Sequence, residues 1–241
     1  MNCISKTDTG LVRANNQDSC LTGELSDNSV FAVVCDGMGG AAGGAVASSL
    51  AVRLIEEQLT SHYNPSMGDK AIKNLLDTVI NAAGIGIFDA ACEDDSLAGM
   101  GTTAVVALIR NETAYIAHAG DSRAYLISGD TINRLTRDHS VVQQMVDNGK
   151  ITQEEALEHP QRNIITRALG VDEYVDTDYC EQHFSPGDCL LLCSDGLTNC
   201  VSDADILATA SVCGFPLLAQ TLISQAKDKG APDNVTVVTV F

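Results

Sequence analysis

The sequence predicts an α+β fold in which antiparallel sheets are covered by helices. Short runs rich in valine, isoleucine, threonine and tyrosine recur along the chain, and these residues are typical of strands. Several of the runs are separated by gaps of turn length, as at 110–112 and 120–122, which favours hairpins. Longer stretches between other runs carry apolar residues at helical spacing.

The elements can be predicted in chain order. Strands are expected at 30–35, 102–109, 113–119, 123–128, 189–193 and 234–241. Helices are expected at 44–60, 71–91, 202–210 and 217–229. The third helix begins at Ser202, a good capping residue with Asp205 three positions later. The segment 147–170 is polar and weakly periodic and contains Pro160, so we expect a surface flap there.

The length and hydropathy of the chain predict a globular protein. Its 241 residues suit one large domain or two small ones, and a hydrophobic content of 45% excludes a disordered chain. No wholly apolar run approaches the roughly 20 residues of a membrane span. The N-terminal stretch MNCISKTDTG lacks the basic and apolar regions of a signal peptide. We therefore expect a soluble cytoplasmic protein without membrane insertion.

The charge of the chain excludes one class of partner. There are 32 acidic and 14 basic residues, giving a formal net charge of −18, and such a surface repels nucleic acid and anionic membranes. An anionic substrate would need local arginines or bound metal cations. The nine cysteines contain no CxxC pair, so we expect small buried side chains in a reducing compartment.

Aspartates recur beside apolar runs and small residues. They are Asp18, Asp36, Asp121, Asp195 and Asp233. Rigid strand ends hold side chains in fixed directions, so converging strands would bring these carboxylates together. Close carboxylates raise each other's pKa, and divalent cations with a preference for hard oxygen ligands, Mg²⁺ or Mn²⁺, would neutralise them. Gly37 has no side chain, so its carbonyl could approach a metal closely. Each aspartate taken alone also fits an ordinary turn.

Arg13 lies five residues before Asp18 in TGLVRANNQDS. A guanidinium beside an acidic metal site is suited to binding a phosphate dianion, although an arginine in a polar segment also fits a solvated surface. The sequence excludes three other kinds of site. GGAAGG is not followed by GK[ST], so it is not a P-loop, and neither the nucleophile elbow GxSxG nor the zinc-binding HExxH occurs.

Taken together and in order, these segments resemble the metal-dependent Ser/Thr protein phosphatases of the PPM (PP2C) family in their compact bacterial form. Any one segment is weak evidence, but the ordered set is specific, and it runs from near Thr9 to the last residue. The matching segments are TGLVRANNQDS, VVCDGMGGAAGG, GMGTTAVVAL, AHAGDSRAYL, RLTRDHS, NGKITQEEALEHPQRNIITRALG, LLLCSDGLTNCVSD and APDNVTVVTV.

The resemblance implies a four-layer αββα sandwich, in which two central antiparallel sheets are flanked by helix pairs. It implies a single phosphatase domain over 1–241, with a flap at about 147–170 that influences substrate choice. It also implies two core Mn²⁺ or Mg²⁺ ions. Asp36 would bridge them, the Gly37 carbonyl would bind one of them, and Asp195 and Asp233 would complete the ligands of the second.

Three further roles follow from the resemblance. Asp18 would hold metal-bound water, Asp121 with Asp195 would hold a third, weaker ion, and Arg13 would bind the phosphate. The implied reaction is hydrolysis of phosphoserine and phosphothreonine by in-line attack of a metal-bridging water. The implied partners are phosphorylated proteins, namely a bacterial Ser/Thr kinase that this enzyme opposes and the substrates of that kinase, and the implied oligomeric state is a monomer.

One position departs from the family. Some relatives carry a histidine after the metal-binding Asp-Gly as a proposed general acid, and this chain has Met38 there. The proton of the leaving group would then come from another source, such as water on the third ion. Two alternatives to a general phosphatase stay open: an inactive relative that only binds phosphoproteins, and an active enzyme for a narrow target such as a stress-response regulator. The absence of a sensor domain or anchor favours a free-standing enzyme.

Overall fold

The computed structural model describes residues 1–241, apart from the side chains of residues 41 and 42. The strands are β1 (Cys3–Asp8), β2 (Asp18–Glu24), β3 (Val30–Met38), β4 (Gly101–Thr102), β5 (Ala104–Arg110), β6 (Thr113–Ala119), β7 (Arg123–Ser128), β8 (Thr131–Arg134), β9 (Asp178–His183), β10 (Cys189–Cys193) and β11 (Val235–Val240). The helices are α1 (Gly40–His62), α2 (Asp69–Glu93), the 3₁₀ turn η1 (Asp95–Leu97), α3 (Val141–Asp147), α4 (Gln153–Glu158), α5 (Asp195–Thr198), α6 (Asp203–Cys213) and α7 (Phe215–Asp228).

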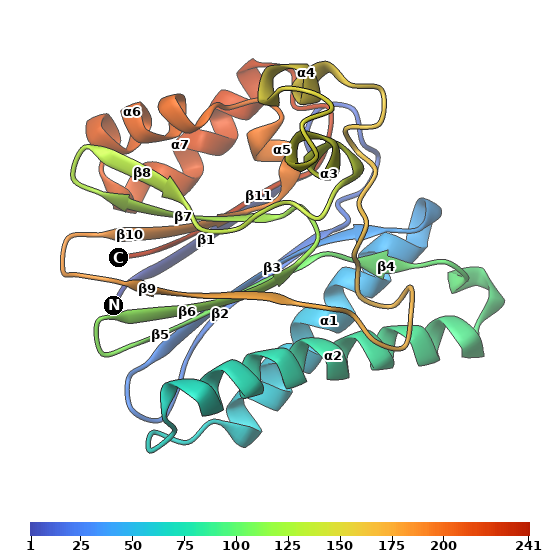
Figure 1. Ribbon diagram of the computed structural model, residues 1–241, viewed down its shortest axis with the longest axis horizontal. Coiled ribbons are helices and arrows are strands. Elements are labelled where there is room, and N and C mark those ends of the chain that lie inside the picture. Colours follow the sequence, from blue (N-terminus) through green and yellow to red (C-terminus); the bar gives the residue numbers. More distant parts are fainter.

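Two antiparallel sheets lie face to face between two pairs of helices (Figure 1). One sheet has the strand order β1-β11-β10-β7-β8 and is covered by α6 and α7. The other has the order β2-β3-β5-β6-β9, with β4 pairing to β3, and is covered by α1 and α2. This arrangement confirms the predicted α+β architecture with four layers.

The central strands are apolar on both faces because each sheet is covered on both sides. In β3, Val30, Ala32 and Val34 face the other sheet, whereas the alternating residues Phe31 and Val33 pack towards α1 and α2. Such strands appear in the sequence as continuous apolar runs, which is why they were predictable. The α2 helix is long and apolar enough to span a membrane by length and composition alone. Its buried residues belong to the core beneath this sheet.

The strands that the sequence pattern missed are the edges of the sheets, namely β1, β8, β2 and β9. An edge strand is solvated along one side and often carries polar residues, so its apolar alternation is weak. In β9, for example, Glu181 and His183 are exposed. All four long helices were predicted, with ends that differ from the observed ones by a few residues.

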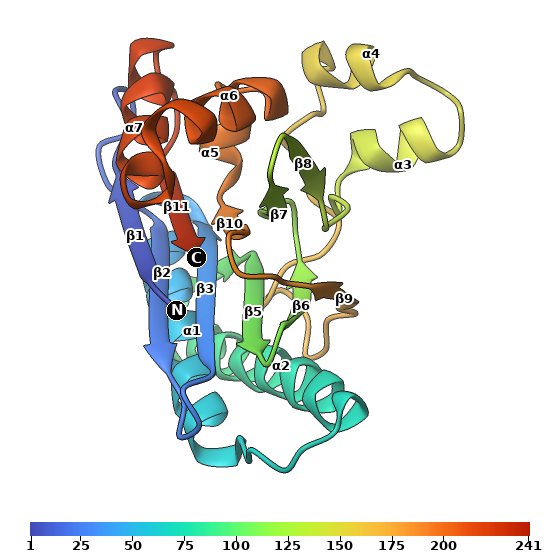
Figure 2. The ribbon, with the colours of Figure 1, turned by 90° about the vertical axis from the view of Figure 1, so that its left-hand side faces the viewer.

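The excursion predicted at 147–170 carries the short helix α4, which lies next to α3 and projects from the sandwich (Figure 2). Thr152 and Glu155 form a capping box at the start of α4. The end of the segment differs from the expectation of a polar surface, because Ala168 and Leu169 are buried. Leu169 exchanges backbone hydrogen bonds of 2.8 and 3.1 Å with Thr102 of β4, which anchors the excursion to the sheet.

The cysteines are free thiols throughout the described side chains. Cys35, Cys189 and Cys193 are buried, as expected, but Cys92 is exposed and the others are partly exposed. The prediction of buried cysteines therefore holds only for those on central strands.

Candidate metal centre

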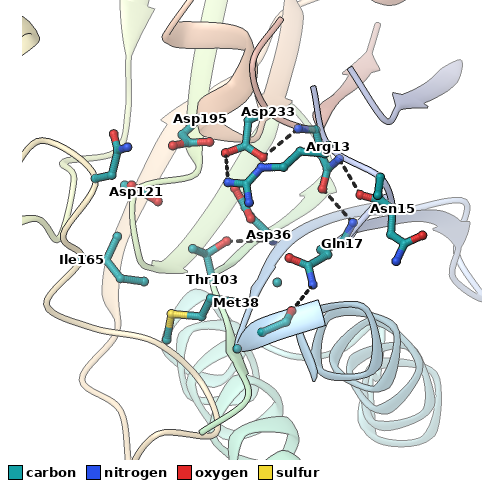
Figure 3. A pocket seen from close by; sticks show the side chains of 16 residues that line it. Arg13, Asn15, Gln17, Asp36, Met38, Thr103, Asp121, Ile165, Asp195 and Asp233 are labelled. Atoms are coloured by element: carbon teal, nitrogen blue, oxygen red, sulfur yellow. Dashed lines mark hydrogen bonds and ion pairs between the residues drawn. The ribbon is translucent and has the colours of Figure 1, made fainter. Parts of the chain in front are cut away.

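The predicted site residues meet at one end of the sandwich. A pocket of about 510 Å³ is lined by six of them, together with Thr103, Asn234 and parts of three loops (Figure 3). The six are Arg13, Asp36, Gly37, Asp121, Asp195 and Asp233. The seventh, Asp18, is buried and lies opposite Asp36 in the pairing of β2 with β3. The structure thus brings together every candidate that the sequence singled out.

The two sheets contribute different members of this cluster. Asp36 lies near the end of β3 in one sheet, whereas Asp195 follows β10 and Asp233 precedes β11 in the other. Asp121 follows β6. Arg13 comes from the loop between β1 and β2, and its Nη2 lies 2.7 Å from Oδ2 of Asp233. The ends of strands from both sheets therefore aim carboxylates into one pocket.

The peptide groups of Asp36 are fixed by two threonines that sequence reasoning did not single out. Thr103 Oγ1 accepts a hydrogen bond of 3.0 Å from the Asp36 N–H, and Thr102 Oγ1 donates one of 2.8 Å to the Asp36 carbonyl. Thr103 Oγ1 also lies 2.7 Å from Ser122 Oγ, beside Asp121. The GMGTT motif was the available signal, because it belongs to the segments that carried the resemblance.

Asn234 also lines the pocket, although its sequence context did not single it out. Its Oδ1 accepts a hydrogen bond of 2.8 Å from Gln17 N–H, and its Nδ2 donates to the carbonyls of Thr9 and Asn15 at 2.9 and 3.0 Å. These bonds hold the loop that carries Arg13 against the start of β11. The available signal was the motif APDN, in which Asn234 directly follows Asp233.

The glycines after Asp36 and Asp195 are required by close packing. A methyl group on Gly37 would overlap the carbonyl oxygen of Gly44 in the first turns of α1. A methyl group on Gly196 would overlap the carbonyl oxygen of Asn234. The Asp-Gly pairs therefore let a helix and a loop approach the carboxylates directly, which an ordinary turn would not require.

The electrostatics of the cluster favour bound cations. Burial, followed by the repulsion of the neighbouring carboxylates, raises the pKa of Asp36 well above its ordinary value. Burial likewise raises the pKa of Asp18 to about 7 and that of Asp121 to about 8. Among the described residues that line the pocket, one carries a side-chain cation, Arg13, against four that carry carboxylates. Without bound cations, the negative charge of these carboxylates is therefore only partly neutralised.

The oxygen atoms of the cluster fit divalent metal ions. Oδ2 of Asp18 accepts a hydrogen bond of 2.7 Å from Ser194 Oγ, but its Oδ1 is buried without a hydrogen-bond partner among the described atoms. A buried carboxylate oxygen without a partner is costly unless something else binds it. Carboxylate and carbonyl oxygens are the ligands that Mg²⁺ and Mn²⁺ prefer. The residues present therefore suit such ions.

A second group of side chains has the chemistry to bind a metal ion, but an arginine lies among them. His118, His139 and Asp178 bring ligand atoms within 4.8 Å of one another. The guanidinium of Arg167 lies among them, with Nη1 at 3.0 Å from His139 Nε2 and 2.7 Å from Asp178 Oδ1. Because the arginine already neutralises Asp178, we assign no metal to this group.

Comparisons with known proteins agree with the geometry of the pocket. The profile of the family described as protein phosphatase 2C matches residues 12–230. The serine/threonine phosphatase stp of Listeria welshimeri is 38% identical over 243 aligned residues, which cover 100% of this chain and 95% of that protein. The structure of the serine/threonine phosphatase of S. agalactiae superposes with a TM-score of 0.93 at 33% identity, covering 100% of this chain and 98% of that one. The catalytic domain of the phosphatase PstP in complex with 2 manganese ions superposes with a TM-score of 0.86 at 35% identity, covering 99% and 96% of the two chains.

Proposed function

The chain belongs to the protein phosphatase 2C family and is a metal-dependent phosphatase of phosphoserine and phosphothreonine. From this premise we propose which of its residues hold the metal ions and which bind the phosphoryl group. Asp36, Asp195 and Asp233, with the carbonyl oxygen of Gly37, would hold two ions. Asp121 with Asp195 would hold a weaker third ion. We propose Mn²⁺ or Mg²⁺ as the metal, in line with the manganese ions of the PstP complex.

One observation carries this proposal: carboxylates from both sheets line one pocket, and the neighbouring Asp18 buries an oxygen that has no hydrogen-bond partner among the described atoms. Ions bound there would activate water as a nucleophile and neutralise the charge of the phosphoryl group. None of the comparisons supports the alternative of an inactive relative.

Arg13 would bind and orient the phosphoryl group. Its side chain is about half exposed and lies at the rim of the pocket, with Nη2 bonded to Asp233. A guanidinium can donate two parallel hydrogen bonds to phosphate oxygens, which fixes the direction from which the phosphorus is attacked. Asp233 would hold the guanidinium in place for this contact.

The pocket contains Met38 where some relatives have a histidine, and none of the described lining residues is a histidine. The apolar Met38 side chain would contact the substrate beside the phosphorylated residue. We propose that the residues over 1–241 act as one phosphatase domain, since both sheets contribute residues to the lining of one pocket. We also propose that this domain acts as a monomer. A reducing compartment such as the cytoplasm suits its free cysteines. A Ser/Thr kinase would be its counterpart.

The test is hydrolysis of a phosphothreonine peptide with Mn²⁺ and with EDTA. The wild type, Asp36→Asn and the control Asp130→Asn would be compared, because Asp130 is exposed in the turn between β7 and β8, away from the pocket. Activity that needs Mn²⁺, persists in Asp130→Asn and is lost in Asp36→Asn is the expected result. Calorimetric titration of Mn²⁺ into each protein would show whether the loss follows from metal binding. A folded wild type without turnover in Mn²⁺ would refute the proposed function.

A further inference from the structure

A second pocket of about 360 Å³ adjoins the metal centre. The two pockets share Met38 and Ile165, so a molecule bound at the metals could continue directly into the second one. We call the second pocket the side groove. It is lined by Met38, Ile165, Thr166, Arg167, Ala168, Val171, Asp172, Tyr174, Val175 and Asp176.

The wall of the side groove is tied to the metal-binding strand. Leu169 is bonded to Thr102 of β4, and β4 pairs with β3 at Gly37 and Met38. Beneath the groove, a side chain on Gly170 would overlap Ile87 of α2, so the backbone there lies directly on the core. The segment 168–170 is therefore a firm extension of the sheet that presents Asp36.

The surface of the groove is both apolar and acidic. Val171 and Tyr174 are 49% and 61% exposed, and together with the partly apolar Met38 they give the groove an exposed apolar surface. Asp172 and Asp176 are exposed beside them. Arg167, the one cation among the described residues that line the groove, is already paired with Asp178 at 2.7 Å. The groove thus offers apolar contact area and uncompensated negative charge.

We propose that the side groove binds the segment of a phosphoprotein next to the phosphorylated residue and selects a basic side chain there. This inference rests on the proposed function, since the phosphorylated residue would be held at the metal centre. Two observations select this occupant. The groove is continuous with the pocket at Met38, and its charge is complementary to lysine or arginine, whose apolar stems would lie along Tyr174.

The experiment uses phosphothreonine peptides in which arginine replaces alanine at each flanking position in turn. The value of kcat/KM for each arginine peptide would be divided by that for the all-alanine peptide, for the wild type and for Asp172→Asn/Asp176→Asn. We expect the ratio to rise at one or two adjacent positions on one side of the phosphothreonine. In the double variant this gain should fall by roughly two- to fivefold per lost charge. Added salt should reduce the gain in the wild type.

The matched control is Asp130→Asn, which removes an exposed carboxylate remote from both pockets. The net charge of −18 attracts any basic peptide, so a gain that is equal at every position, or that falls equally in the control, would overturn the inference. Equal hydrolysis of all peptides by the wild type would also overturn it and leave the proposed function intact. Hydrolysis of none of them in Mn²⁺ would refute the proposed function itself.

Discussion

Ser194 Oγ donates a hydrogen bond of 2.7 Å to Oδ2 of Asp18 and accepts one of 3.0 Å from Thr236 N–H. Asp18 begins β2, whereas Ser194 follows β10 and Thr236 lies in β11, so this chain of bonds joins the two sheets behind the metal centre. Ser194 is completely buried. Its hydroxyl therefore orients the buried carboxylate whose other oxygen has no partner among the described atoms.

Replacing Ser194 with alanine should weaken metal binding. Residues that orient a metal-site carboxylate typically contribute about ten- to a hundredfold to metal affinity, because the freed carboxylate loses both its direction and its hydrogen bond. Calorimetric titration of Mn²⁺ would measure the change. The control is Ser224→Ala, which removes an exposed hydroxyl bonded to a carbonyl within α7. An unchanged Mn²⁺ affinity in Ser194→Ala would contradict the orienting role.

Gly37→Ala should destabilise the protein and disturb the metal centre together. The added methyl group would overlap the carbonyl of Gly44, and a backbone contact cannot move without shifting α1 or β3. Overpacking of this kind costs about 1–3 kcal/mol of the free energy of unfolding, or more. Urea unfolding would measure the loss.

Gly68→Ala is the matched control for this change. A methyl group on Gly68 would meet no atom within 4 Å, and the φ angle of −83° at Gly68 suits alanine. Its free energy of unfolding should stay the same or rise slightly. Equal stability of Gly37→Ala and Gly68→Ala would show that the approach of α1 to Asp36 does not require glycine.

These residues also show how far the sequence alone could lead. Asp36 and Asp195 were predictable because an apolar strand, a carboxylate and a glycine form a local pattern. Ser194 was not, because its partner Asp18 is 176 positions away and nothing near either residue records the contact. The edge strands were missed for a related reason, since their polar faces are explained only by their place in the sheet. Local patterns thus identified the candidate ligands and the central strands, whereas the residues that support them are set by long-range contacts.

The buried pair His118 and His139 should make stability depend on pH. Their rings stack at 4.7 Å, and burial is the main cause that lowers the pKa of each below the ordinary value of 6.5. The unfolded chain therefore takes up protons first as the pH falls. Their contribution to stability is constant above pH 6.5 and is lost as the pH falls from there through the lower pKa of the folded state. Asp178 opposes this shift in the pKa of both rings, and Arg167 reinforces it.

Urea unfolding midpoints measured from neutral pH downward would test this dependence. The curve for His118→Gln should be flatter below pH 6.5 than that of the wild type, because one buried group that resists protonation is gone. His62→Gln is the control, since His62 is exposed at the end of α1 and its ring is bonded only within that helix, to the carbonyl of Gln58. Parallel curves for wild type and His118→Gln would show that the histidine pair does not set the pH dependence.

Arg13 and Asp233 form an exposed ion pair whose effect on catalysis should exceed its effect on stability. The pair is 52% and 30% exposed, and such surface pairs contribute about 0–1 kcal/mol to folding. A charge-assisted hydrogen bond to a phosphate contributes about 1.5–3 kcal/mol. Arg13→Ala should therefore lower kcat/KM for a phosphothreonine peptide by about ten- to a hundredfold. Arg13→Lys should recover part of the loss, because lysine keeps the charge but not the planar pair of donors.

The matched control is Arg53→Ala, which breaks an exposed pair with Glu57 on α1 at 3.0 Å. Both alanine variants lose one surface ion pair of similar exposure, so both should shift the unfolding midpoint by a similar small amount. Only Arg13→Ala should lower kcat/KM, because only Arg13 lines the pocket. If both variants lost activity equally, the effect would come from the net charge of the protein, and Arg13 would have no direct contact with the phosphoryl group.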